Sequence, residues 1–346
     1  MKRPSNHRLT PFPREAGFTL IELMISITLG LLIVAAAAQL FIGGGISMRL
    51  QQSAADTQDN GLFGLDYIAK DIRLANYGNI QNLVMTDTTK DGGIVLTADS
   101  AAITTSNLTG VRTSNLDSDY VSAALVTLGN GDTVGTGNAW TGVTKITSPA
   151  GVKSDQLTIQ FLAPMAMNDC EGNAITQGTR VIERYFLRAD TTDATALVLA
   201  CDAGTISAKV DAVDAVAAAP GQAAIPAIAY VPPIVSNFGD AGQVLINRVE
   251  HLHILLGTQK ADGTLMYYNI HDYKALAVKP QIKSIQFAVL VRSTDNTASA
   301  IVDPTQSFKM LDQTVNVAAT NTTANRYVRR VYSTTMALRN GFGSVS

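Results

Sequence analysis

Cysteine, aromatic residues and charge are all scarce in this chain of 346 residues. Its two cysteines are too few for a disulfide scaffold and too few for a metal site built from cysteine alone. Aromatic residues make up only 6% of the chain, and the abundance of Thr, Ser, Asn, Gly and Ala favours strands and loops over a dense aromatic core. The net charge of −2 gives no electrostatic basis for nucleic-acid binding. We therefore predict no nucleic-acid partner.

Sequence motifs of the common enzyme classes are also missing. The chain contains no Ser nucleophile elbow, no Walker sequence and no HExxH helix. The Gly-rich stretch GNGDTVGTG from Gly129 lacks the spacing of a dinucleotide-binding loop, and no helical pattern follows it, so we interpret it as a turn. We predict that the protein is not an enzyme and uses no cofactor.

Two places in the sequence are candidates for a metal site. Asp117-Ser118-Asp119 matches only part of a calcium-binding loop, because the Gly and the distal Glu of that loop are missing. His251 and His253 are two positions apart on a predicted strand, so both project from the same face, and His271-Asp272 follows. Histidines in this arrangement can chelate a metal, but the spacing places no third ligand beside them. We therefore predict solvent-facing polar positions that alternate with apolar residues, and no metal site.

The most distinctive feature is one long apolar run near the N-terminus. From Phe18 to Ile42 the sequence reads FTLIELMISITLGLLIVAAAAQLFI, and Glu22 is its only ionisable residue. As a helix this run spans about 37 Å, more than the roughly 30 Å of a bilayer's hydrocarbon core. Basic residues precede the run, which predicts a cytoplasmic N-terminus and an exported remainder. A cleaved secretory signal has a shorter apolar core of about 7–15 residues and fits less well.

Glu22 needs its own explanation. A carboxylate inside the apolar layer costs roughly 2.5–3.5 kcal/mol, and a plain membrane anchor has no use for one. From the residues alone two interpretations stay open. Either Glu22 has a function within the membrane, or it lies at the interface and is solvated by lipid headgroups.

The tract Gly17-Phe18-Thr19-Leu20-Ile21-Glu22, with a basic leader before it and a long apolar helix after it, resembles the class III signal of type IV pilins and type II secretion pseudopilins. This resemblance implies that a prepilin peptidase cleaves after Gly17 and N-methylates Phe18. It also implies that Glu22 pairs with the terminal amine of a neighbouring subunit and sets the axial register. That amine adds a full charge to the positive end of the helix dipole.

Within this class the chain resembles PilW-type minor pilins in the tracts NGLFGLDYIAKDIRLANYG, NRVEHLHILLG, IKSIQFAVLVRS and RRVYSTTMALRN. The resemblance implies a structural subunit that primes type IV pilus assembly from the inner membrane and then lies at the pilus base or tip. The implied partners are other minor pilins, the major pilin, the prepilin peptidase, the inner-membrane assembly machinery and membrane lipid. A J-type minor pseudopilin of a type II secretion system is one alternative. A membrane-tethered periplasmic adhesin or enzyme is another.

The predicted architecture is α+β, with a long N-terminal helix packed on an antiparallel β-sheet head. We expect a leader peptide over 1–17, the membrane half of the helix over 18–45, its amphipathic half over 46–78 and a periplasmic head over 79–346. The head is predicted to be β-rich because its apolar residues alternate between turn signals. An Ala/Pro-rich segment, 203–235, is interpreted as a flexible insertion.

Glycines and an apolar stripe set the expected details of the helix. Gly43-Gly44-Gly45 should weaken it locally, and Gly78 is the predicted C-cap. Apolar residues recur every three or four positions in the second half and predict the face that packs on the head: Leu62, Leu65, Ile68, Ala69 and Ile72.

The two cysteines can be interpreted once export is assumed. Cys170 and Cys201 would then meet oxidising conditions, so we predict a disulfide between them, with two buried thiols as the alternative. Closing that loop would stabilise the head by about 3–4 kcal/mol on the chain-entropy model.

Overall fold

The computed structural model describes residues 17–99, 114–117, 121–207, 226, 234–297, 302–317 and 326–338. The chain divides into two compact units, Met1–Gln51 and Gln52–Ser346. The leader before Gly17 and most of the Ala/Pro-rich segment lie outside the described residues. Unit 1 is a helical segment, and unit 2 contains the rest of that helix together with the β-rich head.

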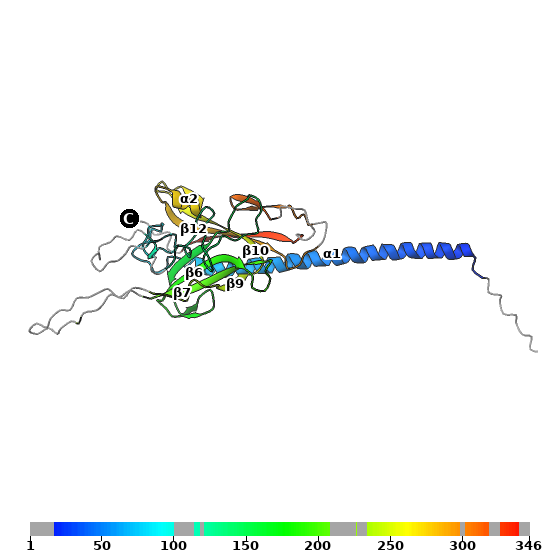
Figure 1. Ribbon diagram of the computed structural model, residues 1–346, viewed down its shortest axis with the longest axis horizontal. Coiled ribbons are helices and arrows are strands. Elements are labelled where there is room, and N and C mark those ends of the chain that lie inside the picture. Colours follow the sequence, from blue (N-terminus) through cyan, green and yellow to red (C-terminus); the bar gives the residue numbers. More distant parts are fainter. Residues whose placement is uncertain are drawn as a thin grey trace, which may run out of the picture. The chain divides into compact units, whose positions relative to one another are not determined.

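Helix α1 (Leu20–Ile72) contributes to both units (Figure 1). It continues through Gly43-Gly44-Gly45 and ends at Ile72, ahead of the predicted end at Gly78. The chain leaves the helix through tighter turns, in which the Leu74 and Ala75 amides donate to the carbonyl oxygens three residues earlier. Asn76 then adopts a left-handed conformation, with φ of 68°. Gly78 is also left-handed, with φ of 83°, and the Asn76 amide donates to the Gln160 carbonyl oxygen at 3.1 Å, so both residues belong to the turn that follows the helix.

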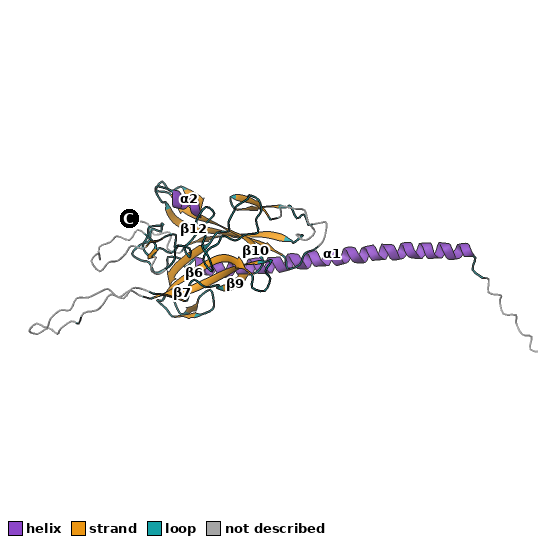
Figure 2. Ribbon diagram, in the orientation of Figure 1, coloured by secondary structure: helices purple, strands orange, loops and turns teal. Residues whose placement is uncertain are grey.

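Antiparallel pairing builds the two principal sheets of the head (Figure 2). The first sheet has the order β3-β6-β7-β8, with β9 also paired to β7. Its strands are β3 (Leu157–Leu162), β6 (Arg180–Ala189), β7 (Leu197–Ile206), β8 (Val235–Ser236) and β9 (Gln243–Ile246). The second sheet has the order β11-β10-β12-β15. Its strands are β10 (Val249–Gln259), β11 (Leu265–Asn269), β12 (Gln281–Arg292) and β15 (Arg329–Ala337).

Smaller elements decorate these sheets. A short helix, α2 (Ile270–Ala275), follows β11 directly, and its N-cap Asn269 accepts a hydrogen bond from the Asp272 amide. Within the described residues, three further sheets have two strands each. They pair β1 (Ala98–Asp99) with β2 (Leu116–Asp117), β4 (Met167–Asn168) with β5 (Ala174–Ile175), and β13 (Ser307–Met310) with β14 (Gln313–Asn316). The long apolar helix and the antiparallel head confirm the predicted α+β class.

The head-packed part of α1 joins both principal sheets in one hydrophobic core. Leu65, Ile68, Ala69 and Ile72 are buried there, as their spacing predicted, but Leu62 is 50% exposed. Two glycines take the closest positions instead, because Gly61 faces the Tyr332 ring and Gly64 faces the Ile246 side chain. A Cβ at either glycine would overlap that neighbour, so the absence of a side chain lets the helix approach strands β9 and β15.

Gly64→Leu should therefore destabilise the head, because the new side chain would overlap Ile246 in a packed core. We expect the free energy of unfolding to fall by about 1–3 kcal/mol, as is typical of overpacking. Chemical denaturation of the detergent-solubilised protein, followed by circular dichroism, measures the change. Gly45→Leu is the control, because nothing lies within 4 Å of the position that a Cβ would occupy there. Equal midpoints for the two variants would contradict the close approach at Gly64.

Candidate functional site

The N-terminus of α1 is closed by a reciprocal pair of hydrogen bonds. The Thr19 Oγ1 accepts from the Glu22 amide at 3.3 Å, and the Glu22 Oε2 accepts from the Thr19 amide at 3.0 Å. The Thr19 hydroxyl also donates to that carboxylate oxygen at 2.9 Å. This is a capping box, in which two otherwise unpaired helix amides are satisfied and a negative charge lies at the positive end of the dipole. Glu22 thus has a partner within its own chain.

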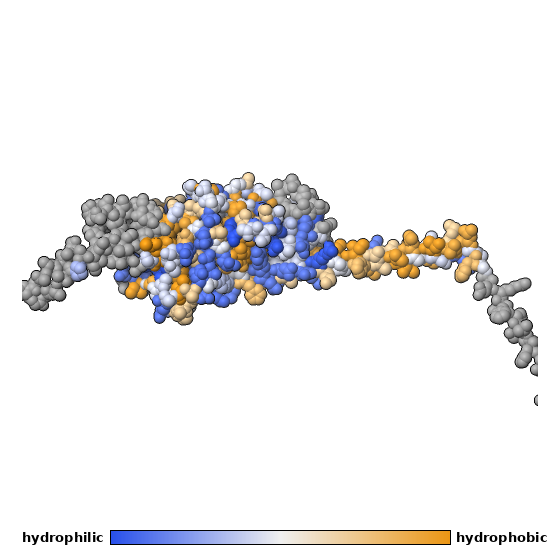
Figure 3. All heavy atoms as spheres, turned by 60° about the horizontal axis from the view of Figure 1, so that its bottom comes forward, coloured by the Kyte–Doolittle hydropathy of each residue, from blue (hydrophilic) through white to orange (hydrophobic). Residues whose placement is uncertain are grey.

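The helix that follows exposes apolar side chains on every side. Among the described residues, α1 is the helix long and apolar enough to cross a membrane. Phe18, ahead of its first turn, is 87% exposed, and Phe41, near the far end of the apolar run, is 83% exposed. Figure 3 shows hydrophobic colouring along this part of the chain. A helix that is apolar all round needs lipid or other helices around it.

Polar side chains inside the apolar run bond back to their own helix. The Ser26 hydroxyl donates to the Glu22 carbonyl oxygen at 2.7 Å, and the Thr28 hydroxyl donates to the Ile25 carbonyl oxygen at 2.9 Å. Such bonds remove the cost of placing a hydroxyl in an apolar layer. Glu22 therefore stands out among these three polar residues, because it is the one that carries an ionisable group.

In the head, Cys170 and Cys201 form the predicted disulfide, with their Cα atoms 6.1 Å apart. The bond joins β7 to the short loop between β4 and β5, and both cysteines are buried. Beside it the Glu183 carboxylate accepts from the Cys170 amide at 3.1 Å and from the Tyr185 hydroxyl at 2.8 Å. Burial, reinforced by the charge of nearby Asp71, raises the pKa of Glu183 well above its usual range. No sequence pattern indicated this buried acid.

The two histidines of β10 are buried, so the prediction of solvent-facing positions was wrong. β10 is covered on its second face by the segment that precedes β3 and by the β13–β14 hairpin. His253 lies between two carboxylates, with Nδ1 2.9 Å from Asp155 Oδ2 and Nε2 2.7 Å from Asp312 Oδ1. His251 contacts Ser154 and Gln313 instead. The alternation of β10 was clear in the sequence, but the second covering layer was not.

The surroundings of the two rings favour opposite charge states. Burial, together with the neighbouring His253 charge, lowers the pKa of His251 to about 3, so it is neutral. Burial alone would also lower the pKa of His253, but its hydrogen bonds and the charges of Asp155 and Asp312 outweigh that effect and raise the pKa to about 9. His253 is therefore an imidazolium that joins three separate segments of the head. His271 is exposed, and its Nδ1 lies 3.2 Å from Asp132 Oδ1.

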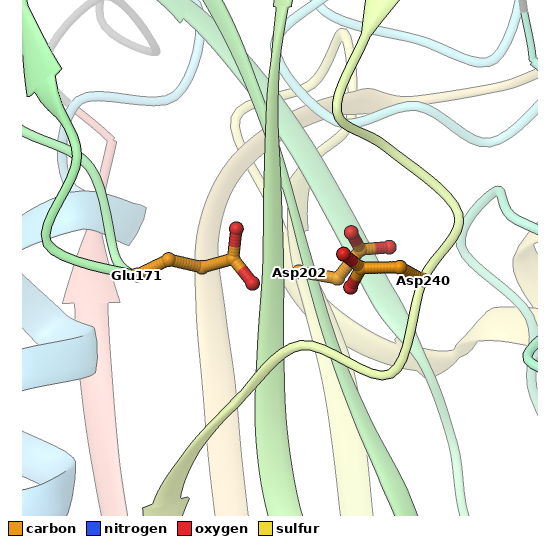
Figure 4. A group of neighbouring side chains, drawn as sticks. All are labelled: Glu171, Asp202 and Asp240. Atoms are coloured by element: carbon orange, nitrogen blue, oxygen red, sulfur yellow. The ribbon is translucent and has the colours of Figure 1, made fainter.

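A set of three carboxylates, Glu171, Asp202 and Asp240, brings one oxygen from each within 4.8 Å of the others (Figure 4). Asp202 is already paired with the buried Arg184 guanidinium at 2.7 Å. Burial and the Asp240 charge raise the pKa of Glu171 to about 7, so this acid is partly protonated at neutral pH. Internal pairing and protonation thus account for the cluster, and we assign no metal to it.

The comparisons with known proteins concern both ends of the chain. Residues 12–38 match the prokaryotic N-terminal methylation motif, and residues 215–340 match the family described as type IV pilus-assembly protein W. No curated protein sequence matches the chain. Among solved structures, a type IV-like pilin from Thermus thermophilus is similar, with 16% identity over 54% of this chain and 77% of that chain. The TM-score between the two chains is 0.27.

The methylation motif, the long apolar helix and the antiparallel head together define a type IV pilin-like protein. Within that class the C-terminal match is to PilW, and the two sequence matches together support a PilW-type minor pilin. This family is a structural one, and it implies membrane anchoring and interaction with other pilins.

The contact of His253 with Asp155 and Asp312 should make the stability of the head depend on pH. Because the folded pKa of His253, about 9, exceeds the unfolded value of 6.5, its stabilisation is complete below pH 6.5 and is lost as the pH rises through 9. The loss should amount to about 3 kcal/mol. Urea denaturation between about pH 6 and pH 10 should show this decline in the wild type and a flatter profile in His253→Gln. Parallel profiles would contradict the charged state.

Proposed function

We propose that this PilW-type pilin primes type IV pilus assembly together with other minor pilins and the major pilin. A prepilin peptidase cleaves after Gly17 and methylates Phe18, leaving a subunit held in the inner membrane by α1 with its head in the periplasm. The observation that carries the proposal is Glu22, a single carboxylate at the start of an apolar helix that is exposed on all sides.

Processing is supported by the local geometry. Gly17 lies before the first helical turn, and nothing is within 4 Å of the position its Cβ would occupy. A peptide bond there can enter a protease site in extended form, since neither helix nor side chain obstructs it. Cleavage would place the new amine of Phe18 directly before the Thr19 N-cap.

Assembly is supported by the two kinds of donor that can bond to the Glu22 carboxylate, those of Thr19 in the same chain and the terminal amine of a neighbouring subunit. Inside one chain its carboxylate accepts from neutral donors of Thr19. A terminal amine from a neighbouring subunit carries a full positive charge, and a charge-assisted bond is roughly twice as strong as a neutral one. In an apolar layer this difference grows, because the effective dielectric constant is low. Glu22 therefore gains from exchanging its internal partner for an intersubunit one, and this favours assembly over storage in the membrane.

The test separates capping from charge pairing. Glu22→Gln keeps an acceptor for the Thr19 amide, as capping boxes allow, but removes the charge. Glu22→Ala removes both. We expect both variants to be cleaved and methylated, yet to incorporate into pili at a level about 10-fold to 100-fold lower, since the lost pair is worth about 1.5–3 kcal/mol. Sheared-pilus immunoblots and mass spectrometry of the N-terminal peptide measure the two effects.

Gly17→Leu serves as the processing control and should accumulate as an unmethylated precursor with its leader attached. If Glu22→Gln assembles like the wild type, the carboxylate acts only as a helix cap. If Gly17→Leu is processed normally, the assigned cleavage position is wrong.

A further inference from the structure

The buried acids of the head differ in whether a cation lies beside them. Four of them form ion pairs with a Lys, Arg or His side chain: Asp87, Asp155, Asp202 and Glu250. Among the described residues, the buried acids Asp71, Asp169 and Glu183 form no such pair. A buried carboxylate without a cation is costly, so this second group requires another form of compensation.

These three acids lie around the loop between β4 and β5, where the end of α1 meets the first sheet. The disulfide between Cys170 and Cys201 ties this loop to β7. The Cys170 amide donates to the Glu183 carboxylate of β6 at 3.1 Å. From the helix, the Tyr67 hydroxyl donates to the Asp169 carbonyl oxygen at 3.4 Å. The loop therefore joins the end of α1 to β6 and β7.

Asp71 belongs to this junction from the side of the helix. It follows Tyr67 by one helical turn, so the two lie on one flank. Its side chain is buried in the last turn of α1, where the negative end of the helix dipole disfavours a carboxylate. Burial and the Asp169 charge raise the pKa of Asp71 to about 7. The Lys70 charge opposes this rise, but Lys70 is exposed and pairs with Asp66 at 3.4 Å.

Glu183 belongs to the same junction from the side of the sheet. It is fully buried, and its two hydrogen-bond donors, the Cys170 amide and the Tyr185 hydroxyl, are neutral. Burial and the charges of Asp71 and Asp169 raise its pKa, so Asp71 and Glu183 lie close enough for one charge to act on the other. Asp169 differs from both, because its carboxylate accepts three hydrogen bonds within its own loop. A proton on Asp71 or Glu183 is therefore the available compensation.

The other titratable groups around the pair bring no positive charge. Burial and the neighbouring acids raise the pKa of the Tyr67 and Tyr185 hydroxyls, so both are neutral. In the loop itself, Glu171 adds another acid, and its carboxylate lies with those of Asp202 and Asp240. Asp71 and Glu183 are thus surrounded by acids and neutral hydroxyls.

We propose that Asp71 and Glu183 keep at least one proton at neutral pH, and that losing it weakens the attachment of the end of α1 to the β4–β5 loop. This attachment, which we call the latch, consists of Tyr67, Asp71, Glu183 and the loop around Cys170. It requires no other subunit, so it goes beyond the proposed function and does not depend on it.

The direction of the pH dependence follows from proton binding. The folded pKa of Asp71, about 7, exceeds its ordinary value of 3.8, so the folded state binds more protons than the unfolded state between these two values. The stabilisation is therefore complete below about pH 4 and is lost as the pH rises through about 7. Mild acid strengthens the latch.

Asp71→Asn tests the proposal, because it removes the charge and keeps the shape of the side chain. Asp66→Asn, at an exposed acid of the same helix, is the matched control. Urea denaturation of the detergent-solubilised protein is measured at about pH 5 and about pH 8. Between these values the unfolding equilibrium constant of the wild type, relative to that of Asp71→Asn, should rise about 10-fold to 100-fold. The contribution of His253 is common to all variants and cancels.

Asp66→Asn should follow the wild type at both pH values. A ratio of wild type to Asp71→Asn that stays the same at both pH values would overturn the proposal. So would an equal change of this ratio in the Asp66→Asn control, because the effect would then belong to any acid of the helix.

Hydrogen exchange locates the effect in the head. The Leu74 amide, just past the end of α1, and the Cys170 amide are both hydrogen-bonded within the junction. In the wild type their protection factors should fall about tenfold or more between about pH 5 and about pH 8, and they should stay level in Asp71→Asn. If both amides keep their protection while the unfolding constant changes, the proton acts elsewhere and the latch is wrong.

Discussion

The apolar surface of α1 between Phe18 and Ile42 is the constraint on which everything else in this protein depends. It is exposed around the whole helix, so its stable surroundings are lipid or the helices of other subunits. The only charge within it, Glu22, lies where the helix dipole is positive, and Thr19 holds it there through a capping box. A helix of this kind can be held in a membrane, and in the proposed function Glu22 exchanges its internal cap for the terminal amine of a neighbouring subunit.

The head depends on a different principle, the internal compensation of charge. The buried Glu250 carboxylate forms an ion pair with the Arg329 guanidinium at 2.6 Å, and Asp202 forms one with Arg184 at 2.7 Å. His253 lies between the carboxylates of Asp155 and Asp312. Removing one member of such a group leaves a buried charge without compensation, which is far more costly than the group itself is stabilising. These clusters, with the disulfide, fix how the loops and the β13–β14 hairpin lie on the sheets. They favour one arrangement of the head, as a rigid surface for contacts with other subunits requires.

The sequence was most informative where a pattern reflects a local rule. The apolar run, the stripe from Leu65 to Ile72 and the cysteine pair could be predicted, since period, length and compartment each determine the outcome. The exposure of Leu62 and the burial of the β10 histidines could not be predicted, because both depend on which distant segments cover that face of the helix or strand. The role of Thr19 as the N-cap could have been predicted, since a threonine three residues before a glutamate is the signature of a capping box. The strand order of the two principal sheets could not be predicted either, because no single-sequence pattern specifies it.

The measurement that tests the central claim most directly is in-membrane crosslinking of the wild-type protein in its own cells, with the N-terminal peptide read from the same mass spectra. We expect a methylated Phe18 as the first residue and crosslinks from the apolar helix to minor and major pilins. A methylated Phe18 with crosslinks to secretion-system components would assign the subunit to a different machine. An intact leader with no pilin partner would contradict a role in pilus assembly.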